Sequence, residues 1–180
     1  MDDVVALRFG FFLGAFALIA LVERAAPRRP PTTSKMRRWS INLLIIALNP
    51  LSVHLVFPVL PVGMALLAEQ RQWGLLSHLG LPSWLDVVIG FVVLDLSIYL
   101  QHVLHHAVPA LWRLHMVHHA DLDYDMTTGL RFHPIEILIS MGIKLMTVAV
   151  LGPPALAVLL FEVALNVGSM FNHSNIRLPI

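Results

Sequence analysis

The segment from Asp95 to His119, DLSIYLQHVLHHAVPALWRLHMVHH, decides what kind of protein this chain forms. It contains six of the ten histidines, in two clusters separated by Pro109. Imidazole is the commonest metal ligand in proteins, and residues three or four positions apart share one face of a helix. Because proline interrupts a helix, we expect two helices that fold toward each other at Pro109. The segment therefore predicts a metal site; scattered histidines on a solvated helix are the less favoured alternative.

Each cluster forms a stripe if its segment is helical. At about 100° per residue, four side chains of the first cluster fall within a sector of roughly 60°: Asp95, Tyr99, His102 and His106. His105 lies off this stripe. The second cluster likewise occupies one helical face, with His115, His118 and His119. We expect Asp95 to orient a ligand imidazole by accepting its N–H, with a hydrogen bond to a neighbouring helix as the alternative.

The composition is that of an integral membrane protein. Hydrophobic residues make up 57% of the 180 residues, charged residues make up 13%, and the mean hydropathy is +0.76. Such a composition exceeds what a soluble core requires. The chain has no cysteine, which excludes disulfides, thiolate-ligated haem and cysteine-bound iron–sulfur clusters. A metal must therefore be held by histidine, carboxylate or water.

Apolar runs predict about five membrane spans in an all-α, multi-pass fold: 4–22, 41–67, 85–100, 135–151 and 155–171. Six of the twelve Lys and Arg residues lie between Arg24 and Arg38. The positive-inside rule makes this loop cytoplasmic, and both histidine clusters and His173 then meet at the cytoplasmic face. Because the basic loop lies between apolar spans and lacks interleaved aromatic residues, we expect no nucleic-acid partner.

Details inside these spans lead to further expectations. The second run contains three prolines, and we expect one kinked span rather than a tight re-entrant pair. Lys144 and Glu162 each stand eight residues from the Gly152 turn in their arms, and we expect them to pair because unpaired charges are costly in hydrocarbon. The acidic residues 121–125 are expected to form a solvated loop, with metal ligation as the alternative.

The chain resembles the fatty acid hydroxylase/sterol desaturase superfamily of integral-membrane di-iron oxidases over about Val87 to Ile180. Five ordered motifs carry the resemblance: Asp95 with Tyr99, His102-x3-His106, Trp112-Arg113-x-His115-x2-His118-His119, Thr128-Gly129-x-Arg131-Phe132-His133-Pro134-x-Glu136, and Asn172-His173-Ser174-Asn175 with Pro179. The resemblance divides the chain into an N-terminal transmembrane region, residues 1–84, and a hydroxylase-like domain, residues 85–180, that is incomplete at its C-terminal end.

The resemblance implies a centre of two iron ions and assigns its ligands. They are His102, His106, His115, His118 and His119, with His173 and His133 as tentative additions; for His133 a structural turn before Pro134 is an equal alternative. His105 is not among them. Asp95 and Tyr99 are implied to support these ligands from behind. The superfamily carries a further H-x2-H-H after its last hairpin, and this sequence reaches Ile180 without it. We therefore expect a fragment, a shortened gene model or a degenerate member.

The activity implied by the resemblance is hydroxylation, or desaturation, of a lipid or sterol C–H bond in lipid biosynthesis. The implied partners are the lipid substrate, O2 and an electron-transfer protein. Oxidation of an unactivated C–H bond requires a redox cofactor because no amino-acid side chain activates O2. Two alternatives remain: a non-catalytic membrane metal transporter or sensor, and an inactive truncated relative. A transporter should place its ligands near the middle of the bilayer, whereas the histidines here gather at one edge.

Overall fold

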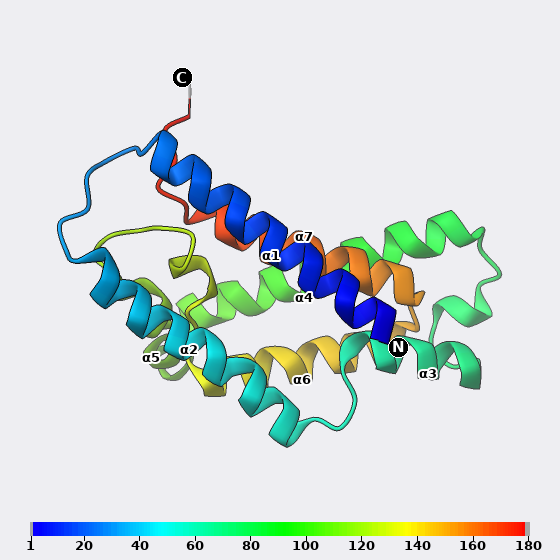
Figure 1. Ribbon diagram of the computed structural model, residues 1–180. Helices are drawn as coiled ribbons and strands as arrows, with labels where there is room; N and C mark the ends of the chain where they lie inside the picture. The colour runs from blue at the N-terminus through cyan, green and yellow to red at the C-terminus, as the bar shows by residue number, and fades with distance from the viewer. Residues whose placement is uncertain (1, 179–180) are drawn as a thin grey trace.

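The computed structural model describes residues 2–178 of the chain, without the side chains of residues 2–5, and this part is helical and contains no strand (Figure 1). Its long helices are α1 (Asp2–Ala25), α2 (Lys35–Val56), α3 (Pro61–Arg71), α4 (Ser83–Ala107), α5 (Pro109–His119), α6 (Pro134–Leu151) and α7 (Ala155–Asn172), with short 3-10 turns η1 (Leu76–His78) and η2 (Thr128–Leu130). Three of these helices, α3, α5 and α6, begin with proline, whose fixed φ and missing N–H suit the first helical position.

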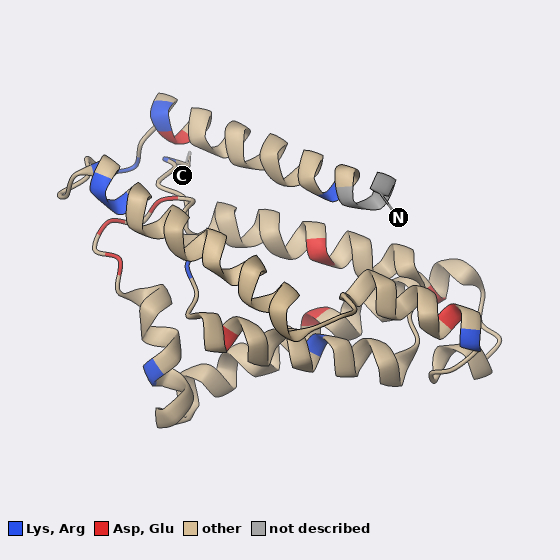
Figure 2. Cartoon of the chain, turned by 60° about the horizontal axis from the view of Figure 1, so that its bottom comes forward, with Lys and Arg blue, Asp and Glu red and all other residues tan. Residues whose placement is uncertain are grey.

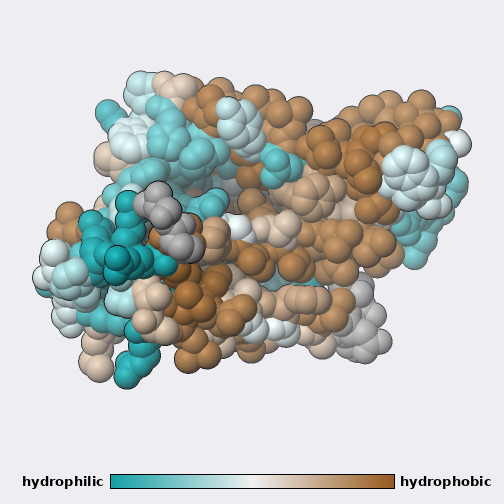
Figure 3. All heavy atoms as spheres, turned by 90° about the horizontal axis from the view of Figure 1, so that it is seen from above, coloured by the Kyte–Doolittle hydropathy of each residue, from teal (hydrophilic) through white to brown (hydrophobic). Residues whose placement is uncertain are grey.

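In the part of the chain that the structure describes, five segments are long and apolar enough to cross a membrane: Ala6–Ala25, Lys35–His78, Ser83–Ala107, Pro134–Leu151 and Ala155–Asn172. Their outer faces expose large hydrophobic side chains such as Phe9, Leu18 and Leu55, and soluble monomeric proteins rarely expose apolar surface over so wide an area. Figure 3 shows hydrophobic residues over the middle of the molecule and hydrophilic residues gathered mainly at one end. The predicted all-α, multi-pass membrane fold is confirmed.

The two ends of the molecule are built from different helix ends and turns. The C-terminal ends of α1, α4 and α7 lie at the same end as the start of α2, as α5 and as the start of α6 (Figure 1). The opposite end holds α3 and the turn between α6 and α7. An isolated bridge between Pro27 and Ile176 joins the loop after α1 to the segment after α7. Segments distant in sequence therefore meet at the end that carries the histidines.

The second apolar run departs from the expected single kinked span. Helix α2 continues through Pro50 and ends at Val56, and a new helix begins at Pro61. The residues before Pro58 and Pro61 are extended, because a proline disfavours helical backbone in the residue that precedes it. The run is therefore two helices, which together still make up one of the five apolar segments.

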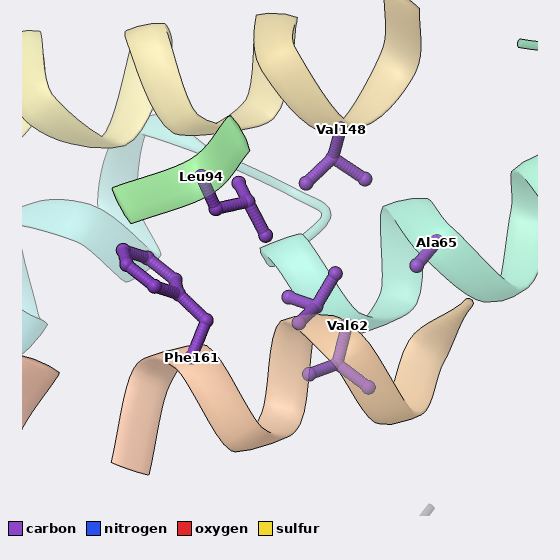
Figure 4. Packing of buried hydrophobic residues seen from close by; sticks show 6 residues of the cluster. Val62, Ala65, Leu94, Val148 and Phe161 are labelled. Atoms are coloured by element: carbon purple, nitrogen blue, oxygen red, sulfur yellow. The ribbon is translucent and has the colours of Figure 1, made fainter. Parts of the chain in front are cut away.

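The apolar core lies where α3, α4, α6 and α7 meet. It contains Val62, Ala65, Leu94, Val148, Val158 and Phe161, most of which are labelled in Figure 4. Gly152 closes α6 with a φ of 64°, a left-handed conformation that favours glycine. A Cβ at Gly152 would lie 2.6 Å from the carbonyl oxygen of Trp73. The turn between α6 and α7 can therefore pack directly against the segment that follows α3.

The intramembrane ion pair is confirmed. The Nζ of Lys144 lies 3.3 Å from Oε1 of Glu162, and the Arg8 guanidinium approaches Oε2 of Glu162 at 2.8 Å. Sequence analysis predicted the first contact and missed the second. Figure 2 shows how few charged residues occupy the middle of the molecule. Three of these residues are gathered on α1, α6 and α7, where mutual neutralisation lowers the cost of their burial. The predicted division at residues 84 and 85 lies two residues inside α4 and stays a prediction.

Candidate metal centre

Helices α4 and α5 bring the two histidine clusters face to face. Helix α4 ends at Ala107, Val108 is extended, and Pro109 starts α5, so the helix breaks where the proline predicted it and α5 packs against α4. His102 and His106 lie one turn apart on α4, with their Nε2 atoms 3.2 Å from each other. The ring centroid of His115 on α5 lies 4.8 Å from those of both. Ring nitrogens of these three residues all lie within 4.8 Å of one another.

Two more imidazole pairs extend this group. The Nε2 atoms of His115 and His119 are 3.2 Å apart, one turn from each other on α5. The Nε2 atoms of His118 and His173 are 2.9 Å apart, although 55 positions separate these residues in the sequence. His173 follows the end of α7 and its Nδ1 donates to the carbonyl of Ser169 at 2.8 Å. That bond assigns the proton to Nδ1 and leaves the lone pair of Nε2 facing His118.

Six imidazoles from three helices thus form one histidine cluster, defined as His102, His106, His115, His118, His119 and His173. All six belong to the set that the resemblance implied. Neighbouring rings hold the cluster in place: Phe132 stacks on His118 with ring centroids 4.4 Å apart and an interplanar angle of 6°. The ligand roles themselves stay predictions, which the geometry supports.

The carboxylate behind the cluster is Glu136. Its Oε1 lies 2.7 Å from Nδ1 of His115, and both side chains are buried. A carboxylate in this position fixes the imidazole tautomer and turns the other ring nitrogen toward the cluster. Asp95, to which sequence analysis assigned this role, is exposed on α4, and so is Tyr99. The motif containing Glu136 was noted in the sequence, but its spacing does not show that the first turn of α6 lies beside His115.

His133 and His105, which belong to the same sequence motifs, lie outside the cluster. His133 is the N-cap of α6, where its Nδ1 accepts a hydrogen bond from the backbone N–H of Ile135 at 3.1 Å. This is the structural alternative that the sequence offered for His133. His105 is buried, its Nδ1 donates to the carbonyl of Gln101 at 2.8 Å, and its ring centroid is 5.7 Å from that of His115. His105 therefore packs next to the cluster without belonging to the stripe.

The electrostatics of the cluster favour neutral imidazole. Burial, followed by the nearby imidazoles of His173 and His115, lowers the pKa of His118 to about 3. Burial and the same kind of neighbours also lower the pKa of His119. Neutral imidazoles offer lone pairs, and several imidazoles that face one another suit a late first-row metal such as iron, copper, zinc or nickel. The donor set and its charge state therefore fit a metal centre.

The acidic residues after α5 form a buried network, which corrects the expected solvated loop. Arg38 on α2 binds Asp121 through two nitrogens, at 2.7 and 2.8 Å, and reaches Asp125 at 2.9 Å. Asp123 accepts hydrogen bonds from Thr32 and Thr33, at distances between 2.6 and 3.0 Å. The carboxylates of Asp121, Asp123 and Asp125 are therefore held by donors of the chain itself. The network ties the segment between α5 and α6 to the start of α2.

Comparisons with known proteins agree with this architecture. The sequence model of the family described as fatty acid hydroxylase matches residues 87–180, just over half of the 180 residues. The ornithine lipid hydroxylase OlsE of Rhizobium tropici is 27% identical over 150 residues, which cover 79% of this chain and 45% of that protein. The chain thus spans less than half the length of this relative. No solved structure matches the chain. Because the family model covers more than half of the chain, the chain belongs to the fatty acid hydroxylase family.

Proposed function

We propose that the protein is a membrane-embedded, iron-dependent oxidoreductase that hydroxylates a C–H bond of a lipid. The observation that carries the proposal is the convergence of imidazoles from α4, α5 and the end of α7, with the Glu136 carboxylate behind His115. Membership in the fatty acid hydroxylase family and the similarity to the ornithine lipid hydroxylase of Rhizobium tropici both support lipid hydroxylation.

The cluster residues would hold two iron ions. Iron, when bound, would supply the activation of O2 that no side chain provides. The reaction balances as R–H plus O2, two electrons and two protons giving R–OH and water, so an electron-transfer protein must deliver the electrons. The residues of the chain contribute orientation: Glu136 fixes His115, the Ser169 carbonyl fixes His173, and Phe132 holds the ring plane of His118. Such support reduces the freedom of each ligand before a metal arrives.

The location of the cluster supports a lipid substrate. It lies at the end of the apolar helices, where a membrane lipid and a water-soluble electron donor can both approach. We propose that this end is cytoplasmic, because the basic residues between Arg24 and Arg38 lie there. A metal transporter is the less favoured function, because of where the histidines lie. The six histidines of the cluster gather at one end of the apolar helices and do not line a path through their middle, where a transporter would place its ligands.

Metal content and product formation test the proposal together. The 180-residue chain, purified in detergent, is expected to contain about two irons per chain by elemental analysis, and a His118→Ala/His119→Ala variant is expected to lose them. His78→Ala, in η1 at the opposite end, is the matched control. With isotopically labelled O2, a reductase system and membrane lipids, mass spectrometry should detect a lipid that has gained one labelled oxygen atom. Bound iron without a labelled product would contradict the hydroxylase proposal; absence of bound iron would contradict the assigned centre.

A further inference from the structure

A polar cavity lies next to the histidine cluster. It has a volume of about 180 Å³ and lies between the loop after α1, the start of α2 and the segment after α5. One of its lining residues, Tyr124, stacks on His173 with ring centroids 5.9 Å apart and an interplanar angle of 14°. The other lining residues are Glu23, Arg24, Pro27, Arg29, Pro31, Lys35, Arg38, Asp123, Asp125 and Asn175. A single aromatic ring therefore separates this cavity from the cluster.

The carboxylates that line the cavity are already occupied by donors from the chain. Glu23 accepts the backbone N–H groups of Met126 and Asn175, both at 2.8 Å. Asp123 is held by the two threonines described above, and Asp125 accepts from Arg38 at 2.9 Å and from Trp39 at 3.0 Å. Glu23 and Asp123 keep their negative charges, because their donors are neutral N–H and O–H groups, whereas Asp125 is paired with the Arg38 guanidinium.

Three basic residues of the cavity are in the opposite situation. Within residues 2–178, Arg24, Arg29 and Lys35 form no salt bridge, whereas Arg38 is consumed by the aspartate network. Arg29 makes one long hydrogen bond, 3.3 Å, to the carbonyl of Leu122, and Lys35 lies 4.6 Å from the ring centroid of Trp39. The hydrophilic end of the molecule that contains these residues is visible in Figure 3. These three cations outnumber the two lining carboxylates that are not paired with arginine, Glu23 and Asp123, so the cavity keeps a net positive charge that is complementary to an anion.

An apolar hollow adjoins the cavity along α2. It has a volume of about 480 Å³ and is lined by Lys35, Met36, Trp39, Ser40 and Leu43, so that Lys35 borders both spaces. Met36 is 82% exposed, although methionine is an apolar side chain. A free phosphate ion would use the cations and leave this hollow empty. A lipid fits both features, with its anionic headgroup among the cations and its chain along the hollow.

We propose that the cavity and the hollow together form a binding site for one membrane lipid with an anionic headgroup. Arg24, Arg29 and Lys35 contact the headgroup, and Met36, Trp39 and Leu43 contact the first part of the acyl chain. The site holds this lipid beside the histidine cluster, with Tyr124 between the headgroup and His173. Binding at this site does not depend on oxidation of the lipid, so it stands apart from the proposed hydroxylase activity.

The test is lipid binding in nanodiscs of phosphatidylcholine. Phosphatidylglycerol with brominated acyl chains is added, and quenching of Trp39 fluorescence is followed, with Trp39→Phe identifying the share due to this residue. Arg24→Gln/Lys35→Gln should weaken binding about thirtyfold, because each basic residue at an anionic surface contributes about fivefold. Arg28→Gln/Arg37→Gln is the matched control, since it removes the same charge from the same loop at positions outside the cavity. Control binding should stay within about twofold of the unchanged protein.

Two further measurements keep the result decisive. Met36→Gln alters an exposed side chain, so folding is unaffected, and it should weaken binding of the brominated lipid without changing the response to inorganic phosphate. Equal loss in both double variants would show general attraction to the charged loop and overturn the proposal. Displacement of the lipid by millimolar inorganic phosphate would show a site for the free ion and would also overturn it. Because none of these readouts requires iron or turnover, failure here is distinguishable from failure of the proposed function.

Discussion

Replacement of Glu162 by glutamine tests whether the buried ion group joins α1, α6 and α7 within hydrocarbon. The carboxylate has a side-chain exposure of 4%, and its oxygens lie 2.8 Å from Arg8 and 3.3 Å from Lys144. At an effective dielectric constant of about 20, each contact is worth about 5 to 6 kcal/mol of Coulomb attraction before desolvation is counted. Loss of the carboxylate leaves two neighbouring cations unpaired, and we expect a decrease of about 3 to 5 kcal/mol in the free energy of unfolding.

Unfolding by SDS titration in mixed micelles measures this change. Arg113→Gln is the control, because it removes an exposed charge on α5, outside the apolar segments, and should change the unfolding free energy by less than about 0.5 kcal/mol. A triple variant, Arg8→Leu/Lys144→Leu/Glu162→Leu, should recover most of the loss, since removing the whole ion group leaves no uncompensated charge. A cost below about 1 kcal/mol for Glu162→Gln, the value of a solvated pair, would refute the reasoning.

Three other predictions follow from local geometry. Glu136→Gln removes the charged acceptor behind His115 and should lower iron affinity about 10- to 100-fold in competition with a chelator, with unchanged folding by circular dichroism; unchanged affinity would contradict the orienting role. Hydrogen bonds from two threonines hold the pKa of Asp123 well below its ordinary value, so its contribution to stability is present above about pH 4 and is lost as the pH falls further. The unfolding temperature of the Asp123→Asn variant should therefore fall less steeply with acid pH than that of the unchanged protein. Equal slopes for the two proteins would contradict this role of Asp123. Gly129→Ala places a Cβ against the backbone of Ser169 and should cost about 1 to 3 kcal/mol in the free energy of unfolding; Gly168→Ala, with open space around it, is the matched substitution on α7, and equal effects would contradict the packing argument.

The predictable features of the fold are those that the local pattern controls. Long apolar runs and proline positions indicate helices and their ends, because hydrocarbon requires every backbone group to be bonded within its own segment. The helix break at Pro109 follows from the proline itself. The pairing of Lys144 with Glu162 follows from the cost of an unpaired charge in hydrocarbon. The break between α2 and α3 was misjudged, since Pro50 is accommodated within a helix while Pro58 and Pro61 are not. Sequence spacing does not distinguish these cases, because the answer depends on what packs against each proline.

The candidate metal centre was also predictable only in part. Sequence spacing alone placed His102 with His106, and His115 with His118 and His119, on common helical faces, because these residues lie within one or two turns of each other. Helical spacing did not link His118 to His173, which lies 55 residues further along the chain. The shared membrane topology brought their segments to the same face.

The sequence by itself determined that this chain is a membrane protein with about five apolar segments and a set of histidines suited to a metal. Composition and helical periodicity are local properties, and they survive in any arrangement of the helices. Only the tertiary structure decided that Glu136 lies behind His115 and that Arg8 joins the buried ion pair, while the supporting role of Asp95 stays a prediction. The same holds for the aspartates, which the sequence placed in solvent and the structure buries around Arg38. The physical reason is that a charged group pairs with the groups that lie near it in space, and the packing of segments distant in sequence determines which groups these are.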